Sequence, residues 1–116
     1  MNYRIERLNG DMQRVLADII EHRIKDPRKT QLVGVTKVDI AKDLKTAKVY
    51  LSVLGDKDSA LTTFNTVVRS TGFIKSELAK EFRDIRQIPD IHFILDNTSE
   101  YGERIDKILK EIQRDD

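Results

Sequence analysis

The spacing of the apolar residues changes along the chain, and this change constrains the fold more than any other feature. From Arg4 to Lys25 apolar residues recur every three or four positions, which indicates one amphipathic helix that ends before Pro27. In residues 34–41 and 46–54 they alternate with polar residues, as in strands with one buried face. Helical and strand periods within one short chain predict an α+β domain built in layers.

The two alternating segments predict an antiparallel hairpin. We expect the first strand to bury Thr36, Val38 and Ile40 and to turn the odd-numbered residues of 35–39 outward. In the second strand the odd-numbered residues of 47–53 face inward, and Tyr50 lies among the outward residues. The connecting segment 42–45 is short and polar, but it lacks the Asn-Gly or Asp-Gly pair that would identify the turn type.

A second helical pattern follows, and it is interrupted. Asp58 is the expected N-cap of this helix. Its apolar pattern is interrupted at Ser70-Thr71-Gly72 and continues from Phe73. These three small or weakly helix-forming residues favour a kink between two helices. A continuous helix that tolerates Gly72 for close packing remains the alternative.

The last third of the sequence predicts a short strand and a final helix. Residues 91–95 alternate as a strand, and residues 97–100 have the spacing of a capping box that opens an amphipathic helix ending near Ile112. The expected order is helix, strand, strand, kinked helix pair, strand, helix. We expect a single domain over residues 1–116, with 113–116 as a short polar tail.

The charges are distributed unevenly although the formal net charge is only +1. Residues 1–55 carry 11 basic and 7 acidic side chains, whereas residues 90–116 carry 4 basic and 8 acidic ones. Ordinary charge mixing on solvated faces would explain this pattern, and so would a basic front with an acidic back. The residues alone leave both interpretations open.

The residue types needed for catalysis are scarce. The chain has no Cys, and its two histidines, His22 and His92, stand 70 positions apart, so no metal site or cofactor is expected. Phosphate-binding, dinucleotide-binding and nucleophile-elbow glycine motifs are missing from the sequence. No apolar run reaches the roughly 18 residues of a membrane span. The sequence predicts a soluble, cytoplasmic protein that is not an enzyme.

Nucleic-acid binding is better supported, because basic residues gather at segments that a fold can bring together. Arg4, Arg7 and Arg14 share a helix face, and further cations follow the helix end, occupy the hairpin and flank the kink. Gly72 lets another backbone approach closely, and Tyr50 offers one ring for stacking. The candidate phosphate contacts are Arg4, Arg7, Arg14, Arg28, Lys29, Lys45, Lys48, Arg69 and Lys75.

Six segments form a characteristic series along residues 3 to 112. They are Asp26–Arg28, Val35–Val38, Asp43–Tyr50, Gly72–Leu78, Arg86–Phe93 and the region from Asp96 to Ile105. In order and spacing, this series resembles the bacterial ribosome-binding factor A family.

The resemblance implies a type II KH-like domain with a three-stranded sheet and helices packed on one face. It implies a non-catalytic assembly factor that binds the free small (30S) ribosomal subunit and its 16S rRNA. Such factors support late maturation and 16S precursor processing, including adaptation to cold. The expected partners are the small subunit, 16S rRNA and other small-subunit assembly factors, and the expected oligomeric state is a monomer.

Two features qualify what the resemblance implies. KH domains that bind single strands carry a Gly-x-x-Gly loop, which this chain lacks, so backbone and shape contacts to folded rRNA are expected instead. The family has Ala-x-Gly at the kink, and here Ser70 stands in the place of the alanine. An alternative function stays open: a protein-interaction module of the same fold that reaches the ribosome through a protein partner bound by its amphipathic last helix.

Overall fold

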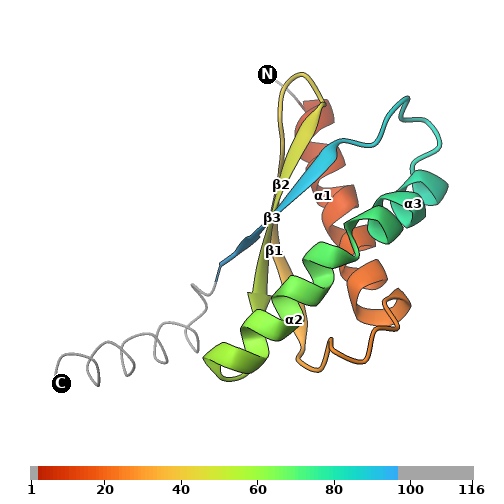
Figure 1. Ribbon diagram of the computed structural model, residues 1–116. Coiled ribbons are helices and arrows are strands. Elements are labelled where there is room, and N and C mark those ends of the chain that lie inside the picture. Colours follow the sequence, from red (N-terminus) through yellow and green to blue (C-terminus); the bar gives the residue numbers. More distant parts are fainter. Residues whose placement is uncertain (1–2, 97–116) are drawn as a thin grey trace, which may run out of the picture.

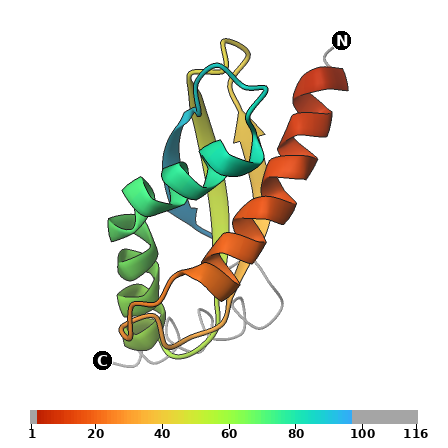
Figure 2. The same cartoon turned by 90° about the vertical axis from the view of Figure 1, so that its right-hand side faces the viewer.

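The computed structural model describes residues 3–96, which fold into a layer of helices packed on one face of a sheet (Figures 1 and 2). In chain order the elements are α1 (Tyr3–Asp18), the π-helical turn η1 (Ile19–Arg23), β1 (Val33–Ile40), β2 (Thr46–Val53), α2 (Lys57–Arg69), α3 (Thr71–Glu81) and β3 (Asp90–Leu95). The predicted α+β class and its three-stranded sheet are confirmed. The predicted final helix and polar tail lie outside the described residues.

The sheet is mixed, with β2 in the centre. β1 and β2 are antiparallel, so that Ile40 faces Ala47, as the predicted hairpin requires. β2 and β3 are parallel, from Thr46 beside Asp90 to Leu51 beside Leu95. A parallel pair needs a long crossover connection, and α2 and α3 provide it. This crossover places both helices on the same face as α1 (Figure 2).

The predicted facing of β1 is correct for its second half and wrong for its first. The pairing register shifts between Val35 and Lys37, because Thr36 is an extra residue in β1 that forms a β-bulge. Thr36 is therefore exposed, and its hydroxyl donates to the Tyr50 carbonyl at 3.2 Å. Val35, which was expected to face outward, packs against the core instead.

The core lies between the helices and the inner face of the sheet. Its fully buried members come from both the helices and the sheet. Burial on one side of each element explains why apolar residues recur every three or four positions in the helices and every second position in the strands. They include Met12, Leu16, Ile19, Ile20, Val49, Leu51, Val67, Ile74 and Leu78.

The first helix does not continue to Lys25 as predicted. It changes to π-helical geometry at Ile19 and ends at Arg23, because Ile24 is already extended with φ −80° and ψ 117°. A π turn brings residues five positions apart onto one face, and Arg23 accordingly donates to the Asp18 carboxylate at 2.8 Å. Helical periodicity in the sequence cannot reveal such a local widening.

The break between α2 and α3 exists at Ser70, where the sequence predicted a kink. The Ser70 hydroxyl donates to the Thr66 carbonyl at 2.9 Å, and its own carbonyl accepts the amide of Ile74 at 2.9 Å. Ser70 thus ends one helix and starts the next. The predicted N-cap of α2 was wrong: Asp56, not Asp58, accepts the Ser59 amide at 2.8 Å.

The hairpin turn has a conformation that the sequence did not indicate. The Leu44 amide donates to the Ala41 carbonyl at 2.8 Å, which closes a four-residue β-turn. Leu44 itself is left-handed, with φ 63°, and no other non-glycine residue among residues 3–96 has a positive φ. A left-handed residue with a side chain costs roughly 1 kcal/mol compared with glycine.

Candidate nucleic-acid interface

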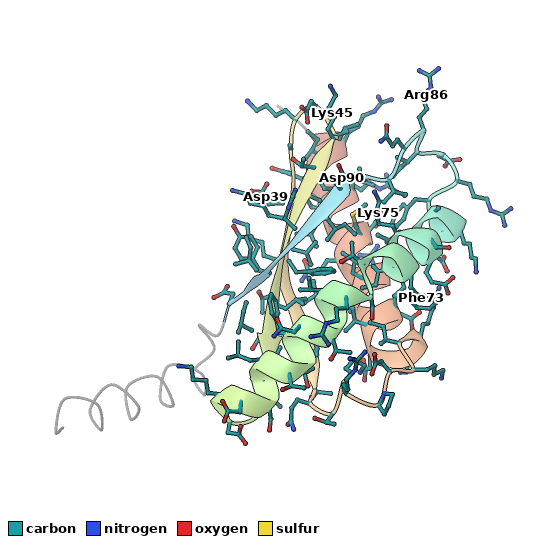
Figure 3. All side chains as sticks on the ribbon, in the orientation of Figure 1. Asp39, Lys45, Phe73, Lys75, Arg86 and Asp90 are labelled. Carbon is teal, nitrogen blue, oxygen red and sulfur yellow. The ribbon has the colours of Figure 1, made fainter. Side chains whose placement is uncertain are left out.

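One end of the molecule presents cations from three separate segments. They come from the start of α1, from the hairpin turn and from the loop between α3 and β3, and Lys45 and Arg86 mark this end in Figure 3. Among the described residues, none of these side chains has an ion-pair partner. We call this group the turn-end cluster, and its members are Arg4, Arg7, Lys42, Lys45 and Arg86.

Specific hydrogen bonds hold these segments together. The Asn9 side chain of α1 accepts the Ile40 amide at 3.0 Å, which ties α1 to the end of β1. The Asp90 amide donates to the Lys45 carbonyl at 2.9 Å, which ties the loop before β3 to the turn. The position of the turn-end cluster is therefore set by the fold, whereas its charged side chains reach into solvent.

Four of the predicted phosphate contacts lie outside the turn-end cluster. Arg28 and Lys29 follow η1, and Arg69 lies close enough to Asp26 to help lower the pKa of that carboxyl. Lys48 is the third residue of β2, and its exposed side chain alternates with the buried Ala47 and Val49, so it lies on the outer face of the sheet. The structure thus brings the helix end and the kink together, but not the hairpin turn with them.

Three predicted contacts are occupied by carboxylates. Arg14 pairs with Asp11. Arg28 donates two hydrogen bonds to the Asp26 carboxylate, from Nε at 3.0 Å and from Nη2 at 2.6 Å. These bonds lower the pKa of Asp26 from 3.8 to about 2.

Lys75 is the third occupied cation. Its Nζ lies 2.8 Å from Asp90 Oδ1, and the two side chains face each other in Figure 3. The bond lowers the pKa of Asp90. A phosphate at Arg14, Arg28 or Lys75 would have to compete with a carboxylate that is already in place.

The α2–α3 junction combines an exposed aromatic ring with an open backbone. Phe73, at the start of α3, is 44% exposed, although it belongs to the apolar pattern that predicted this helix (Figure 3). A Cβ added at Gly72 would meet no atom within 4 Å. The alternative in which Gly72 serves close internal packing is therefore wrong, and the junction has room for a partner's backbone.

The helix-free face of the sheet carries a mixed set of side chains. Lys37 lies over the Tyr50 ring, with Nζ 5.7 Å from the ring centroid, which is within range of a cation–π interaction. Lys48 has Asp39 and His92 as its cross-strand neighbours. Acidic and basic groups alternate here, so this face is less positive than the turn end.

Sequence reasoning missed several residues that the structure brings to these surfaces. Arg86 belongs to the family series in the sequence, and within residues 3–96 it is also a cation of the turn end without an ion-pair partner. Lys42 was recognised in the turn but not selected. No sequence signal marks these two cations, because Asp43 follows Lys42 directly and Asp84 stands two positions before Arg86. Their lack of ion pairs within the described residues is seen only in the folded structure.

Other kinds of site are not seen in residues 3–96. No group of three or more potential metal ligands occurs within this range. No helix of the described part has the length and apolarity that a membrane crossing requires.

Comparison with known proteins decides the family. The family model described as ribosome-binding factor A matches residues 4–109. This chain belongs to the ribosome-binding factor A family. The family is a non-catalytic ribosome-binding factor, which confirms the prediction that the chain is not an enzyme.

Individual relatives agree with the family assignment. The ribosome-binding factor A of Staphylococcus epidermidis is 40% identical over 115 residues, which span 99% of this chain and 97% of the relative. The crystal structure of the Thermus thermophilus family member has the same fold, with a TM-score of 0.69 at 24% identity over 82% of this chain and 98% of that one.

One similar set of coordinates comes from a ribosomal complex. It is a homology model of Thermus thermophilus ribosome-binding factor A, fitted into a cryo-EM map of a complex with the 30S subunit. It has a TM-score of 0.64 and 26% identity to this chain, and it covers 79% of this chain and 94% of its own. The 30S subunit is therefore the partner recorded for that relative.

Proposed function

We propose that this protein is an assembly factor that binds the free 30S ribosomal subunit through contacts to 16S rRNA. It supports late maturation of the subunit and processing of the 16S precursor, including during growth in the cold. It acts as a cytoplasmic monomer, as one type II KH-like domain and without a cofactor. The observation that carries this proposal is the turn-end cluster, where cations from three segments meet and have no carboxylate partner within residues 3–96.

The turn-end cluster suits folded RNA for an electrostatic reason. A cation without a partner binds a phosphate and releases the phosphate's counterions, without first losing an ion pair of its own. Arg69 and the open backbone at Gly72 offer a second, smaller contact at the α2–α3 junction. Because the chain lacks the Gly-x-x-Gly loop of KH domains that read single strands, these contacts favour recognition of backbone and shape over base identity.

The small net charge of +1 supports selectivity. Non-specific binding to nucleic acid grows with the number of phosphates that a protein neutralises. With few surplus cations, random RNA is held weakly. Tight binding then requires the arrangement of phosphates that only the subunit surface presents.

Co-sedimentation with purified 30S subunits tests the proposal. We expect Lys45→Glu/Arg86→Glu to lower the affinity on the order of 100-fold, because two phosphate contacts become repulsive. The matched control Lys25→Glu/Lys57→Glu changes the net charge equally at exposed positions away from the turn. It should bind nearly as well as the unchanged protein. Equal losses in both variants would contradict the proposed surface.

The role in maturation needs a test in cells. Cells without this protein should accumulate 16S precursor ends, and more of them in the cold. The unchanged protein and the control variant should restore processing, whereas Lys45→Glu/Arg86→Glu should not. Restoration by the turn-end variant would show that processing does not depend on this surface.

A further inference from the structure

Leu44 at the tip of the hairpin has a strained backbone conformation that packing in the core does not offset. Its φ of 63° lies in the left-handed region, where glycine and asparagine are favoured over leucine. Its side chain is 44% exposed, so core packing does not compensate for the strain. Strained residues of this kind concentrate at functional sites.

The surroundings of Leu44 are cationic. The Asp43 carboxylate accepts the Lys45 amide at 3.0 Å, so this acid is engaged in shaping the turn. Lys42 and Lys45 flank the turn without ion-pair partners among the described residues, and Arg86 marks the same end of the molecule in Figure 3. Within the described residues, the turn therefore presents one exposed apolar side chain between two cations that have no ion-pair partner, with the Asp43 carboxylate beside it.

We propose that Leu44 is an apolar wedge that contacts the faces of unstacked bases in rRNA, while Lys42 and Lys45 hold the neighbouring phosphates. Proteins that bend or open nucleic acids insert leucine and similar residues at base steps in this way. The flanking cations favour RNA over a protein pocket, because an apolar pocket on a protein would not need phosphate-binding groups on both sides. The inference rests on the proposed function and assigns the part of the turn end that touches bases.

The geometry predicts opposite effects on stability and on binding. Leu44→Asn places a residue that tolerates left-handed geometry at the tip and removes the apolar wedge. We expect its thermal midpoint to rise by about 3 °C, because the backbone strain is relieved. Its affinity for 30S subunits should fall about tenfold, because the buried area of a leucine side chain is lost.

A matched control is available at the opposite end of β2. Leu54 follows the strand and is 42% exposed, close to the 44% of Leu44. Leu54→Asn should leave the affinity for 30S subunits unchanged. If Leu44 served only the fold, Leu44→Asn would not combine a higher thermal midpoint with weaker binding to 30S subunits.

Two results would overturn the wedge. If Leu44→Asn binds 30S subunits as well as the unchanged protein, Leu44 makes no contact; the proposed function stands if Lys45→Glu/Arg86→Glu still loses binding. If Leu44→Asn weakens binding to 30S subunits but not to protein-free 16S rRNA, the partner of Leu44 is a ribosomal protein. A tenfold loss on both probes supports the wedge.

Discussion

The turn-end cluster and the surroundings of Arg23 are both rich in charge, yet they differ in how their cations are used. Arg23 bridges three carboxylates: Asp18 at 2.8 Å, Glu77 at 3.4 Å and Glu81 at 3.0 Å. The bonds to Glu77 and Glu81 join η1 to α3. The pKa of Asp18 is lowered first by its hydrogen bond to His22 and then by Arg23, and the pKa of Glu77 is lowered first by Lys80 and then by Arg23. Lys45 and Arg86 have no such partner among residues 3–96.

The number of cations in a region therefore does not identify a binding surface. A cation that is bonded to carboxylates helps to hold the fold, and its field is largely cancelled outside the molecule. An unpaired cation contributes little to the fold and keeps its field available to a phosphate. Substitutions in the two regions should therefore affect different measurements.

The largest change in stability is expected at Arg23. Arg23→Gln keeps a polar side chain but shortens it and removes the charge, and it leaves Glu77, whose side chain is only 13% exposed, with fewer bonds. The thermal midpoint should fall by a few degrees. Binding to 30S subunits at a temperature where the variant is folded should be unchanged. Loss of binding by the folded variant would remove the distinction between the two regions.

A smaller and opposite change is expected at the α2–α3 junction. Gly72→Ala should stabilise the protein by about 0.5–1 kcal/mol, because alanine is the better helix former and its Cβ meets no atom within 4 Å. If a phosphate backbone approaches Gly72, the affinity for 30S subunits falls severalfold at the same time, and we expect this result. A stabilised variant with full affinity would limit the binding surface to the turn end.

The smallest effect is expected at Asp26, where it is best measured by NMR titration of the carboxyl carbon. Its pKa should be about 2, and Arg28→Ala should return it toward 3.8. Because the folded pKa is lowered, the Arg28 bonds stabilise the protein above the ordinary carboxyl pKa. This contribution is lost as the pH falls toward 2. If the pKa of Asp26 were unshifted, Arg28 would not be bonded to this carboxylate and would belong with the unpaired cations.

The fold was predictable where periodicity reports burial, because the stripes of α1 and β2 follow directly from which side chains lie in the core. It was not predictable where backbone geometry changes locally. The bulge at Thr36, the π turn at Ile19 and the left-handed Leu44 each depend on tertiary context that no spacing rule contains.

The candidate interface was predictable only in part, for a related reason. The sequence identified Lys45 and the interruption at Ser70, since charge and helix breakers are local properties. It could not tell that Lys75 pairs with Asp90 or that Phe73 is exposed, because both facts depend on residues from other elements. Sorting cations by their partners requires the folded structure.

The salt dependence of 30S binding shows which cations make the phosphate contacts. The logarithm of the association constant falls linearly with the logarithm of salt concentration, by roughly one unit of slope for each phosphate contact. We predict that Lys45→Glu/Arg86→Glu reduces the steepness of this slope by about two units, whereas Arg23→Gln leaves it unchanged. An unchanged slope for the turn-end variant, or an equal reduction for Arg23→Gln, would contradict the claim that unpaired cations at the turn end make the phosphate contacts.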